Sequence, residues 1–222
     1  MEATIRRLKE STEAGRSQVR DSLVRFASRH ELEDWEGRFS PYDDQIHDAV
    51  LSDIAPGDVV LDIGAGDLRL ALRLAQRAQK VYAIEVNPLL VAQALDIIGL
   101  DLPRNLHVIC GNALDLLIPR DVTAAVLLMR HCQHFAVYFD RLQATGCQRL
   151  FTNARWKNDV ELIDLTVPGL AFQDLREGWY ACRCGATGYV GTGTKPDAVP
   201  VEVIGCPACS AVNRERGNST DG

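Results

Sequence analysis

Short apolar runs alternate with stretches of helical periodicity through the middle of the chain. The apolar runs are rich in Val, Ile and Leu, and they predict strands at residues 59–63, 80–86, 106–110, 124–129 and 148–152. The stretches between them predict helices at residues 68–77, 88–98 and 136–144. Strands and helices in alternation predict an open α/β sheet, mostly parallel, with helices on both faces.

The residues before this sheet predict a helical leader. Val19, Leu23 and Phe26 recur at helical spacing, and Pro41 begins a second predicted helix that ends at Leu51. We therefore expect four regions. They are a helical leader or cap at residues 1–55, an α/β core at 56–177, a small cysteine-bearing knuckle at 178–210 that continues the sheet, and a flexible tail at 211–222.

The composition and the distribution of charges argue against a secreted protein and against a membrane-spanning one. The chain has 222 residues, of which 46% are apolar and 24% charged, so it can bury one full core. Residues 1–16 are studded with charges and do not form a secretory signal, and no apolar run is long enough to span a bilayer. We expect a cytoplasmic protein. A formal charge of -6 gives no general positive surface for nucleic acid, although a local basic face remains open.

A cofactor site is predicted at the end of the first strand. The run from Val59 to Asp67 is an apolar strand that enters a turn containing Gly64 and Gly66. Glycines there let the backbone pass close to a ligand. Glu85 ends the second predicted strand, where a carboxylate can accept hydrogen bonds from both hydroxyls of a ribose.

Two cofactor classes fit this arrangement. A nicotinamide dinucleotide fold favours a third glycine three residues after the second, but position 69 is Arg. This departure favours S-adenosylmethionine and leaves a nicotinamide oxidoreductase as the weaker alternative.

Residues from about 41 to 153 resemble the core of class I S-adenosylmethionine-dependent methyltransferases. The segments Leu61–Gly66, Ala83–Glu85 and Cys110–Ala113 are similar to three of that family's motifs. The resemblance implies a Rossmann-like sheet of the seven-stranded type. It also implies that Asp62, Gly64 and Gly66 face the amino acid part of the cofactor, that Glu85 binds the ribose, and that Asn112 and Ala113 lie beside the adenine. Leu68 stands where the family often has a third glycine.

The methyl acceptor is expected beside the segments that follow the fourth and fifth strands, because ligands of such sheets bind outside the carboxyl ends of the strands. His131 or His134 can act as a general base, with helix capping or cofactor contact as the alternative role. Arg130, Asn153, Arg155 and Trp156 are candidate substrate contacts. The Asn/Asp-Pro-Pro-aromatic motif of amino-group methyltransferases is absent from the sequence, which disfavours a planar exocyclic nitrogen. Amine, hydroxyl and ring-atom acceptors stay open.

Four of the seven cysteines form two close pairs near the C-terminal end of the sequence, Cys182 with Cys184 and Cys206 with Cys209. Pairs of thiolates at two hairpin tips are typical of a closed, structural Zn²⁺ site. The region resembles a zinc ribbon, although one residue, and not two, separates the first pair.

The sequence therefore favours an S-adenosylmethionine-dependent methyltransferase that acts on a macromolecule, either protein or RNA. The alternative is a non-catalytic, cofactor-binding module that docks a partner through its zinc ribbon.

Overall fold

The computed structural model describes residues 1–12, 42–130, 132–156, 159–192 and 199–209. The predicted leader helix around residues 17–29, His131 and the tail expected at 211–222 lie outside these ranges. Where the structure describes the chain, no helix is long and apolar enough to cross a membrane.

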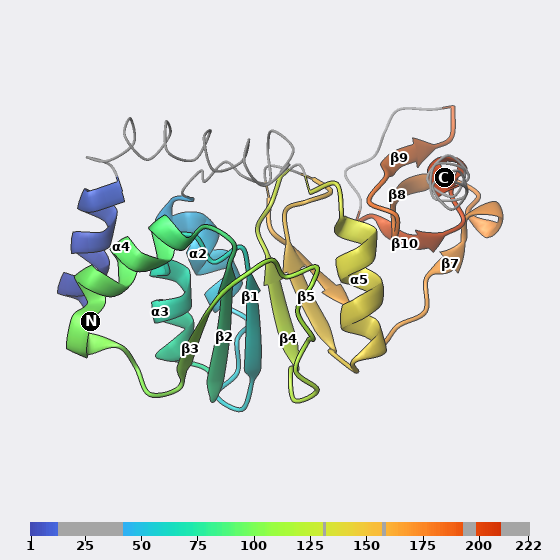
Figure 1. Cartoon of the computed structure of the whole chain (residues 1–222). Coiled ribbons are helices and arrows are strands. Elements are labelled where there is room, and N and C mark those ends of the chain that lie inside the picture. Colours follow the sequence, from blue (N-terminus) through green and yellow to red (C-terminus); the bar gives the residue numbers. More distant parts are fainter. Residues whose placement is uncertain (13–41, 131, 157–158, 193–198, 210–222) are drawn as a thin grey trace, which may run out of the picture.

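The main sheet has the strand order β3-β2-β1-β4-β5-β6 (Figure 1). Its first five strands are parallel to their neighbours, and β6 pairs with β5 in the antiparallel direction. The predicted strands are all found, each within two residues of its expected ends. The bounds are β1 Val59–Ile63, β2 Lys80–Glu85, β3 Leu106–Cys110, β4 Ala124–Leu127, β5 Arg149–Thr152 and β6 Glu161–Asp164. The described residues supply six strands to this sheet, so the expected seventh strand is not found among them.

Helices cover both faces of the main sheet, as predicted. They are α2 Asp44–Leu51, α3 Arg69–Ala75, α4 Pro88–Ile98 and α5 Phe135–Ala144, with short 3-10 turns at Gly99–Asp101 (η1) and Phe172–Asp174 (η2). Buried side chains of α2, α3 and α4 form one core with the sheet, and α5 packs in a second core on the opposite face. The helix predicted from Pro41 begins at Asp44, because the Asp43 carboxylate accepts the Ile46 N–H at 3.1 Å and caps it.

Within the expected helical leader, residues 2–12 form a helix whose bounds were not predicted. Leu8 is 1% exposed and joins the core of α2, α3 and α4. The Thr4 hydroxyl donates to Asp101 at 2.7 Å, and Gln93 donates to the Ser11 hydroxyl at 2.7 Å. This charged segment is therefore fixed on the same face of the sheet as α4.

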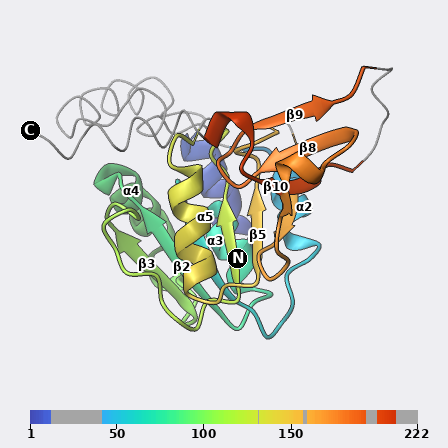
Figure 2. The ribbon, with the colours of Figure 1, turned by 90° about the vertical axis from the view of Figure 1, so that its right-hand side faces the viewer.

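The cysteine-bearing region forms a second sheet beside α5 (Figures 1 and 2). Its strands are β7 Leu170–Ala171, β8 Gly178–Cys182, β9 Thr187–Val190 and β10 Val201–Ile204, in the order β7-β10-β8-β9. β8 and β9 form an antiparallel hairpin, whereas β10 runs parallel to both β7 and β8. The expectation that this region continues the main sheet is wrong, because its strands pair only with one another in the described residues.

Candidate active site and cysteine cluster

The turn after β1 is built on left-handed backbone. Gly64 and Gly66 have φ of 75° and 57°, and the N–H groups of Gly64 and Ala65 both donate to the Ile84 carbonyl of β2. Leu68 also adopts a positive φ, of 63°, which is uncommon for a residue with a side chain. The leucine at the third-glycine position therefore keeps the glycine conformation, and its side chain is fully buried.

Glu85 lies at the carboxyl end of β2, directly beside this turn. Its Oε2 accepts the Gly66 N–H at 2.9 Å, and its Oε1 accepts the Asn87 N–H at 2.8 Å. Burial raises the pKa of Glu85, while these backbone hydrogen bonds act in the opposite direction. Each carboxylate oxygen retains a second acceptor position, which is what two ribose hydroxyls require.

Asp62 is the most conspicuous polar group of the site. It is 3% exposed, and its Oδ2 has no hydrogen-bond partner among the described residues. Burial, with the nearby Glu85 and Asp67 carboxylates, raises the pKa of Asp62 to about 7. A buried carboxylate without a partner is costly, and a cationic ligand group would relieve that cost.

Asn112 and Ala113 follow β3, the next strand along the sheet edge. The Gly111 N–H donates to the Glu85 carbonyl at 2.9 Å, which holds this segment beside the end of β2. The Asn112 Oδ1 accepts the Leu114 N–H at 3.0 Å, so the side chain also shapes its own turn. The predicted cofactor residues of β1, β2 and β3 are thus brought to one edge of the sheet.

A buried ion pair next to the glycine turn was missed. The Asp67 Oδ2 accepts from Arg69 Nε at 2.8 Å and from the Thr12 hydroxyl at 2.8 Å. Arg69 is 3% exposed and also reaches the Tyr42 carbonyl. From the sequence alone, Arg69 is interpreted only as a departure from the nicotinamide glycine pattern. The spacing of Asp67 and Arg69, two residues apart, is the sequence feature that indicates their ion pair.

His47 of α2 is a second buried group that the sequence did not single out. It is 5% exposed, and its Nδ1 has no partner within the described part of the chain. Burial and the neighbouring Arg69 and Arg73 lower the pKa of His47 to about 4. The imidazole is therefore neutral at physiological pH.

The segment after β4 lies against the glycine turn. A Cβ placed on Gly64 would come within 2.8 Å of the Met129 Cε, so the Met129 side chain lies directly over this glycine. Arg130 is exposed, with its guanidinium 4.9 Å from the centre of the Tyr42 ring. His134 is half-buried at the N-cap position of α5, and its side chain makes no capping hydrogen bond. The capping alternative for His134 therefore loses its support.

The residues after β5 divide into different roles. Asn153 is fully buried, and its Nδ2 and Oδ1 have no hydrogen-bond partners among the described residues. Trp156 is half-buried and packs edge-on against Trp179 of β8, with ring centres 6.2 Å apart.

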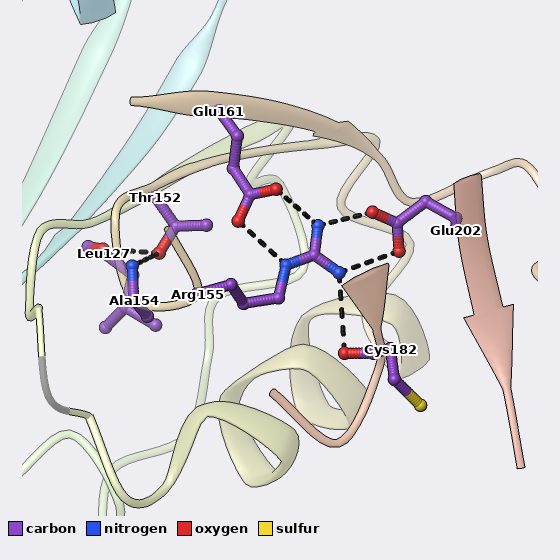
Figure 3. Close-up of polar contacts among 7 residues, drawn as sticks. All are labelled: Leu127, Thr152, Ala154, Arg155, Glu161, Cys182 and Glu202. Carbon is purple, nitrogen blue, oxygen red and sulfur yellow. Dashed lines mark hydrogen bonds and ion pairs between the residues drawn. The ribbon is translucent and has the colours of Figure 1, made fainter. Parts of the chain in front are cut away.

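Arg155 differs from the prediction of a substrate contact. Its side chain is fully buried, and its guanidinium binds Glu161 of β6 and Glu202 of β10 (Figure 3). Burial alone would lower the pKa of Arg155, but hydrogen bonds to these two carboxylates raise it above its usual value. All of its donor nitrogens face protein acceptors, so a direct substrate contact by Arg155 does not fit this arrangement.

The four predicted metal ligands gather in the second sheet. The Sγ atoms of Cys182, Cys184, Cys206 and Cys209 all lie within 4.8 Å of one another. Three of the pairs are 3.5, 3.5 and 3.8 Å apart. The first pair lies at the β8–β9 hairpin as expected. The second pair follows β10 at a helical turn, so the expected second hairpin tip is wrong.

Comparison with known proteins finds relatives for the segment that carries the glycine turn and Glu85. Residues 56–128 match the model of a family described as "Putative methyltransferase". The "Probable ribosomal RNA small subunit methyltransferase A" of Methanosarcina acetivorans is 43% identical over 70 residues, which are 32% of this chain and 25% of that protein. A dimethyladenosine transferase of Yarrowia lipolytica is 32% identical over 69 residues, 31% of this chain and 22% of that protein.

One solved structure illustrates the extent of the structural similarity. The RNA methyltransferase from Salinibacter ruber, in complex with S-adenosyl-L-homocysteine, has 20% identity and a TM-score of 0.43, covering 53% of this chain and 82% of that one. The chain spans about a quarter of the length of the curated relatives it matches. The family match ends at Leu128, so it includes the glycine turn and Glu85 but neither α5 nor the cysteine cluster.

Proposed function

We propose that this protein is an S-adenosylmethionine-dependent methyltransferase that acts on RNA. The observation that carries the proposal is Asp62, a buried carboxylate without a partner that lies beside a left-handed glycine turn and the fixed carboxylate of Glu85. An unpartnered anion and a polar edge suit a ligand with both a cationic amino group and a ribose.

The residues divide the binding of the cofactor between them. Asp62 accepts from the ammonium of its amino acid part, and Gly64 and Gly66 let the backbone approach that part closely. Glu85 accepts from the ribose hydroxyls, and Asn112 and Ala113 line the adenine side. When bound, the cofactor would supply an electrophilic methyl group, and the segment after β4, which lies against the glycine turn through Met129, would border it.

RNA is the acceptor that we favour, because the relatives of the matched segment are named as ribosomal RNA methyltransferases and as a dimethyladenosine transferase. His134 and His131 are the candidate bases, and Arg130, Asn153 and Trp156 are the candidate RNA contacts. Arg130 is exposed, and Trp156 is half-exposed.

We further propose that the cysteine cluster binds one structural Zn²⁺. Tetrahedral coordination at a Zn–S distance of about 2.3 Å places neighbouring sulfurs about 3.8 Å apart. Three of the sulfur–sulfur spacings, at 3.5, 3.5 and 3.8 Å, are close to that value, and all four sulfurs lie within 4.8 Å of one another. Four thiolates leave no open coordination position for substrate, so the ion would have a structural and not a catalytic role.

Two experiments test the proposed function. The first is calorimetric titration of the purified protein with S-adenosylmethionine, S-adenosylhomocysteine and NAD, and we expect binding of the two sulfur nucleotides alone. The second is incubation with methyl-labelled cofactor and either total RNA or total protein, and we expect label in RNA. Binding of NAD alone would reject the cofactor. Binding of S-adenosylmethionine without transfer to either pool would favour the non-catalytic docking module.

A further inference from the structure

Two residues near the start of α5, Met129 and Phe135, each lie beside a glycine with a positive φ. Met129 packs over Gly64 of the cofactor turn. Phe135 packs against Gly185, which follows Cys184 in the cysteine knuckle. A Cβ on Gly185 would lie 3.5 Å from the Phe135 Cδ1, and Gly185 has a φ of 97°. The knuckle therefore contacts the first residue of α5 directly.

Arg155 makes a second connection between the knuckle and the same helix end. Its guanidinium lies 5.4 Å from the centre of the Phe135 ring. The same group donates to Glu161 at 2.6 and 2.8 Å, to Glu202 at 2.9 Å and to the Cys182 carbonyl at 3.5 Å (Figure 3). One buried side chain thus joins β6, β8 and β10 on top of Phe135.

These contacts continue to the end of β4. The Thr152 hydroxyl donates to the Leu127 carbonyl at 2.8 Å, and it accepts the Ala154 N–H at 3.1 Å (Figure 3). Ala154 is followed directly by Arg155. Hydrogen bonds and the peptide link between Ala154 and Arg155 therefore connect the last residue of β4, through the β5 loop, to the backbone of the first cysteine.

We infer that the cysteine-bearing sheet is a positioning element for the acceptor side of the site, and that Arg155 and Gly185 are its positioning residues. The inference rests on the proposed function, in which the methyl acceptor lies beside His134 at the start of α5. Arg155 and Gly185 touch neither cofactor nor acceptor in this account. They fix the backbone from which His134 and the β5 loop project.

The site has two halves, the cofactor edge and the acceptor side at the start of α5, and only the acceptor side should depend on the cysteine-bearing sheet. Among the described residues, the contacts of the second sheet described above are with α5 and with the segment after β5, whereas the cofactor edge is made by β1, β2 and β3. Loss of metal should therefore loosen α5 and leave cofactor binding unchanged. If the knuckle were only a general stabiliser of the fold, both halves would loosen together.

Hydrogen exchange on the full chain tests this separation. The Zn²⁺-loaded protein is compared with protein stripped by a chelator, by following the amides from Tyr138 to Leu142 in α5 and, as a matched helix, those from Val91 to Leu95 in α4. We expect exchange in α5 to accelerate about tenfold or more on stripping, with α4 unchanged. We also expect S-adenosylhomocysteine affinity to stay within about twofold, a change of less than half a kcal/mol.

The variant Glu202→Gln gives a second test, made without removing the metal. It keeps the size of the side chain and removes the negative charge of one of the two carboxylates that pair with the Arg155 guanidinium. Glu177→Gln is its matched control, an exposed glutamate of the same region that accepts from the Tyr189 hydroxyl at 3.0 Å. Glu202→Gln should accelerate exchange in α5 with metal still bound, and Glu177→Gln should not.

Unchanged exchange in α5 after metal removal, or equal acceleration in α5 and α4, would overturn the inference. These outcomes are distinct from failure of the proposed function. That failure would appear as absent S-adenosylhomocysteine binding in the metal-loaded protein, whatever the exchange in α5.

Discussion

The backbone N–H of Gly66 donates to the Oε2 of Glu85 across 2.9 Å. This bond joins the turn after β1 to the end of β2, and the Asn87 N–H holds the other oxygen of the same carboxylate. Glu85 is therefore fixed before any ligand arrives. A fixed acceptor costs less conformational entropy on binding than a mobile one, so this bond contributes to cofactor affinity as well as to the fold.

Replacement of this carboxylate should weaken cofactor binding strongly. In Glu85→Gln, one acceptor oxygen becomes an NH₂ group that faces a backbone donor, and the charge that favours ribose hydroxyls is lost. Hydrogen bonds to charged groups contribute about 1.5–3 kcal/mol each, so we expect S-adenosylhomocysteine affinity to fall by about tenfold or more in calorimetry.

The control for this prediction is Asp96→Asn, which removes an exposed carboxylate of α4. It should bind S-adenosylhomocysteine as the wild type does. A thermal melt of Glu85→Gln separates lost binding from lost folding, and Asn112→Ala offers an independent substitution at the same edge. Wild-type affinity in Glu85→Gln would contradict the ribose assignment.

The left-handed backbone at Leu68 should make a glycine substitution there more stable than an alanine substitution, which is the reverse of the order in a helix. Removing this fully buried side chain costs about 2–5 kcal/mol in either variant. Leu68→Gly, however, relieves a left-handed conformation that costs about 1–2 kcal/mol in L-residues. We therefore expect Leu68→Gly to be more stable than Leu68→Ala by about 1 kcal/mol, after the extra chain entropy of glycine is deducted. Denaturant unfolding measures the difference.

Leu72 is the matched comparison, since it is equally buried and lies one turn later in α3. There, helical φ makes glycine less stable than alanine by about 1 kcal/mol. The same order of the two substitutions at both positions would show that Leu68 carries no backbone strain.

Asp62 and His47, both buried, should change the free energy of unfolding with pH in opposite directions. The pKa of Asp62 is about 7 in the folded protein, above its usual value, so its effect is to lower stability as pH rises from about 4 to 7. The pKa of His47 is about 4, below its usual value, so its effect is to lower stability as pH falls from about 6.5 to 4. In the wild type the two effects oppose each other between pH 4 and 6.5.

Substitution of either group should remove its contribution to the pH dependence of stability. Relative to the wild type, Asp62→Asn should have a free energy of unfolding that increases with pH between about 4 and 7, and His47→Gln one that decreases with pH between about 4 and 6.5. Urea unfolding at a series of pH values gives these slopes. Parallel curves for the three proteins would show that neither group is shifted as described.

The cysteine cluster should hold one Zn²⁺ per chain. Cys206→Ser replaces a buried ligand, so we expect loss of bound zinc in elemental analysis and a lower Tm. Cys110→Ser is the control, because Cys110 is exposed at the end of β3 and lies outside the cluster. Wild-type protein that is purified under reducing conditions without metal would rule out the zinc assignment.

The sequence predicted the parts of this molecule that depend on local pattern. The apolar runs predicted the strands of the parallel sheet, and the glycines with Glu85 indicated the sheet edge at which we propose that the cofactor binds. The cysteine pairs indicated a cluster that the fold brings together. In each case the signal lies within a few residues of the feature it predicts.

The parts that were missed depend on distant partners. From the sequence alone, Arg155 is interpreted as a surface cation. Its two partners, Glu161 and Glu202, lie 6 and 47 residues later in the chain, and only the fold brings them to it. The N-terminal helix has little apolar periodicity, since Leu8 is the only fully buried apolar residue among residues 2–12 and the other buried residue is Thr4. The two-residue strand β7 is too short to leave any pattern. Its pairing with β10, rather than with the main sheet, follows from tertiary contacts alone.

The central place of β10 sets the order in which the second sheet can assemble during synthesis. Glu202 and both cysteines of the second pair emerge from the ribosome after every residue of β1 to β9. Until they do, Arg155 has one carboxylate partner, Cys182 and Cys184 have no sulfur partners from the second pair, and β7 and β8 lack the strand that joins them. A nascent chain stopped before β10 can complete its parallel sheet, yet it leaves the knuckle open and unable to close around an ion.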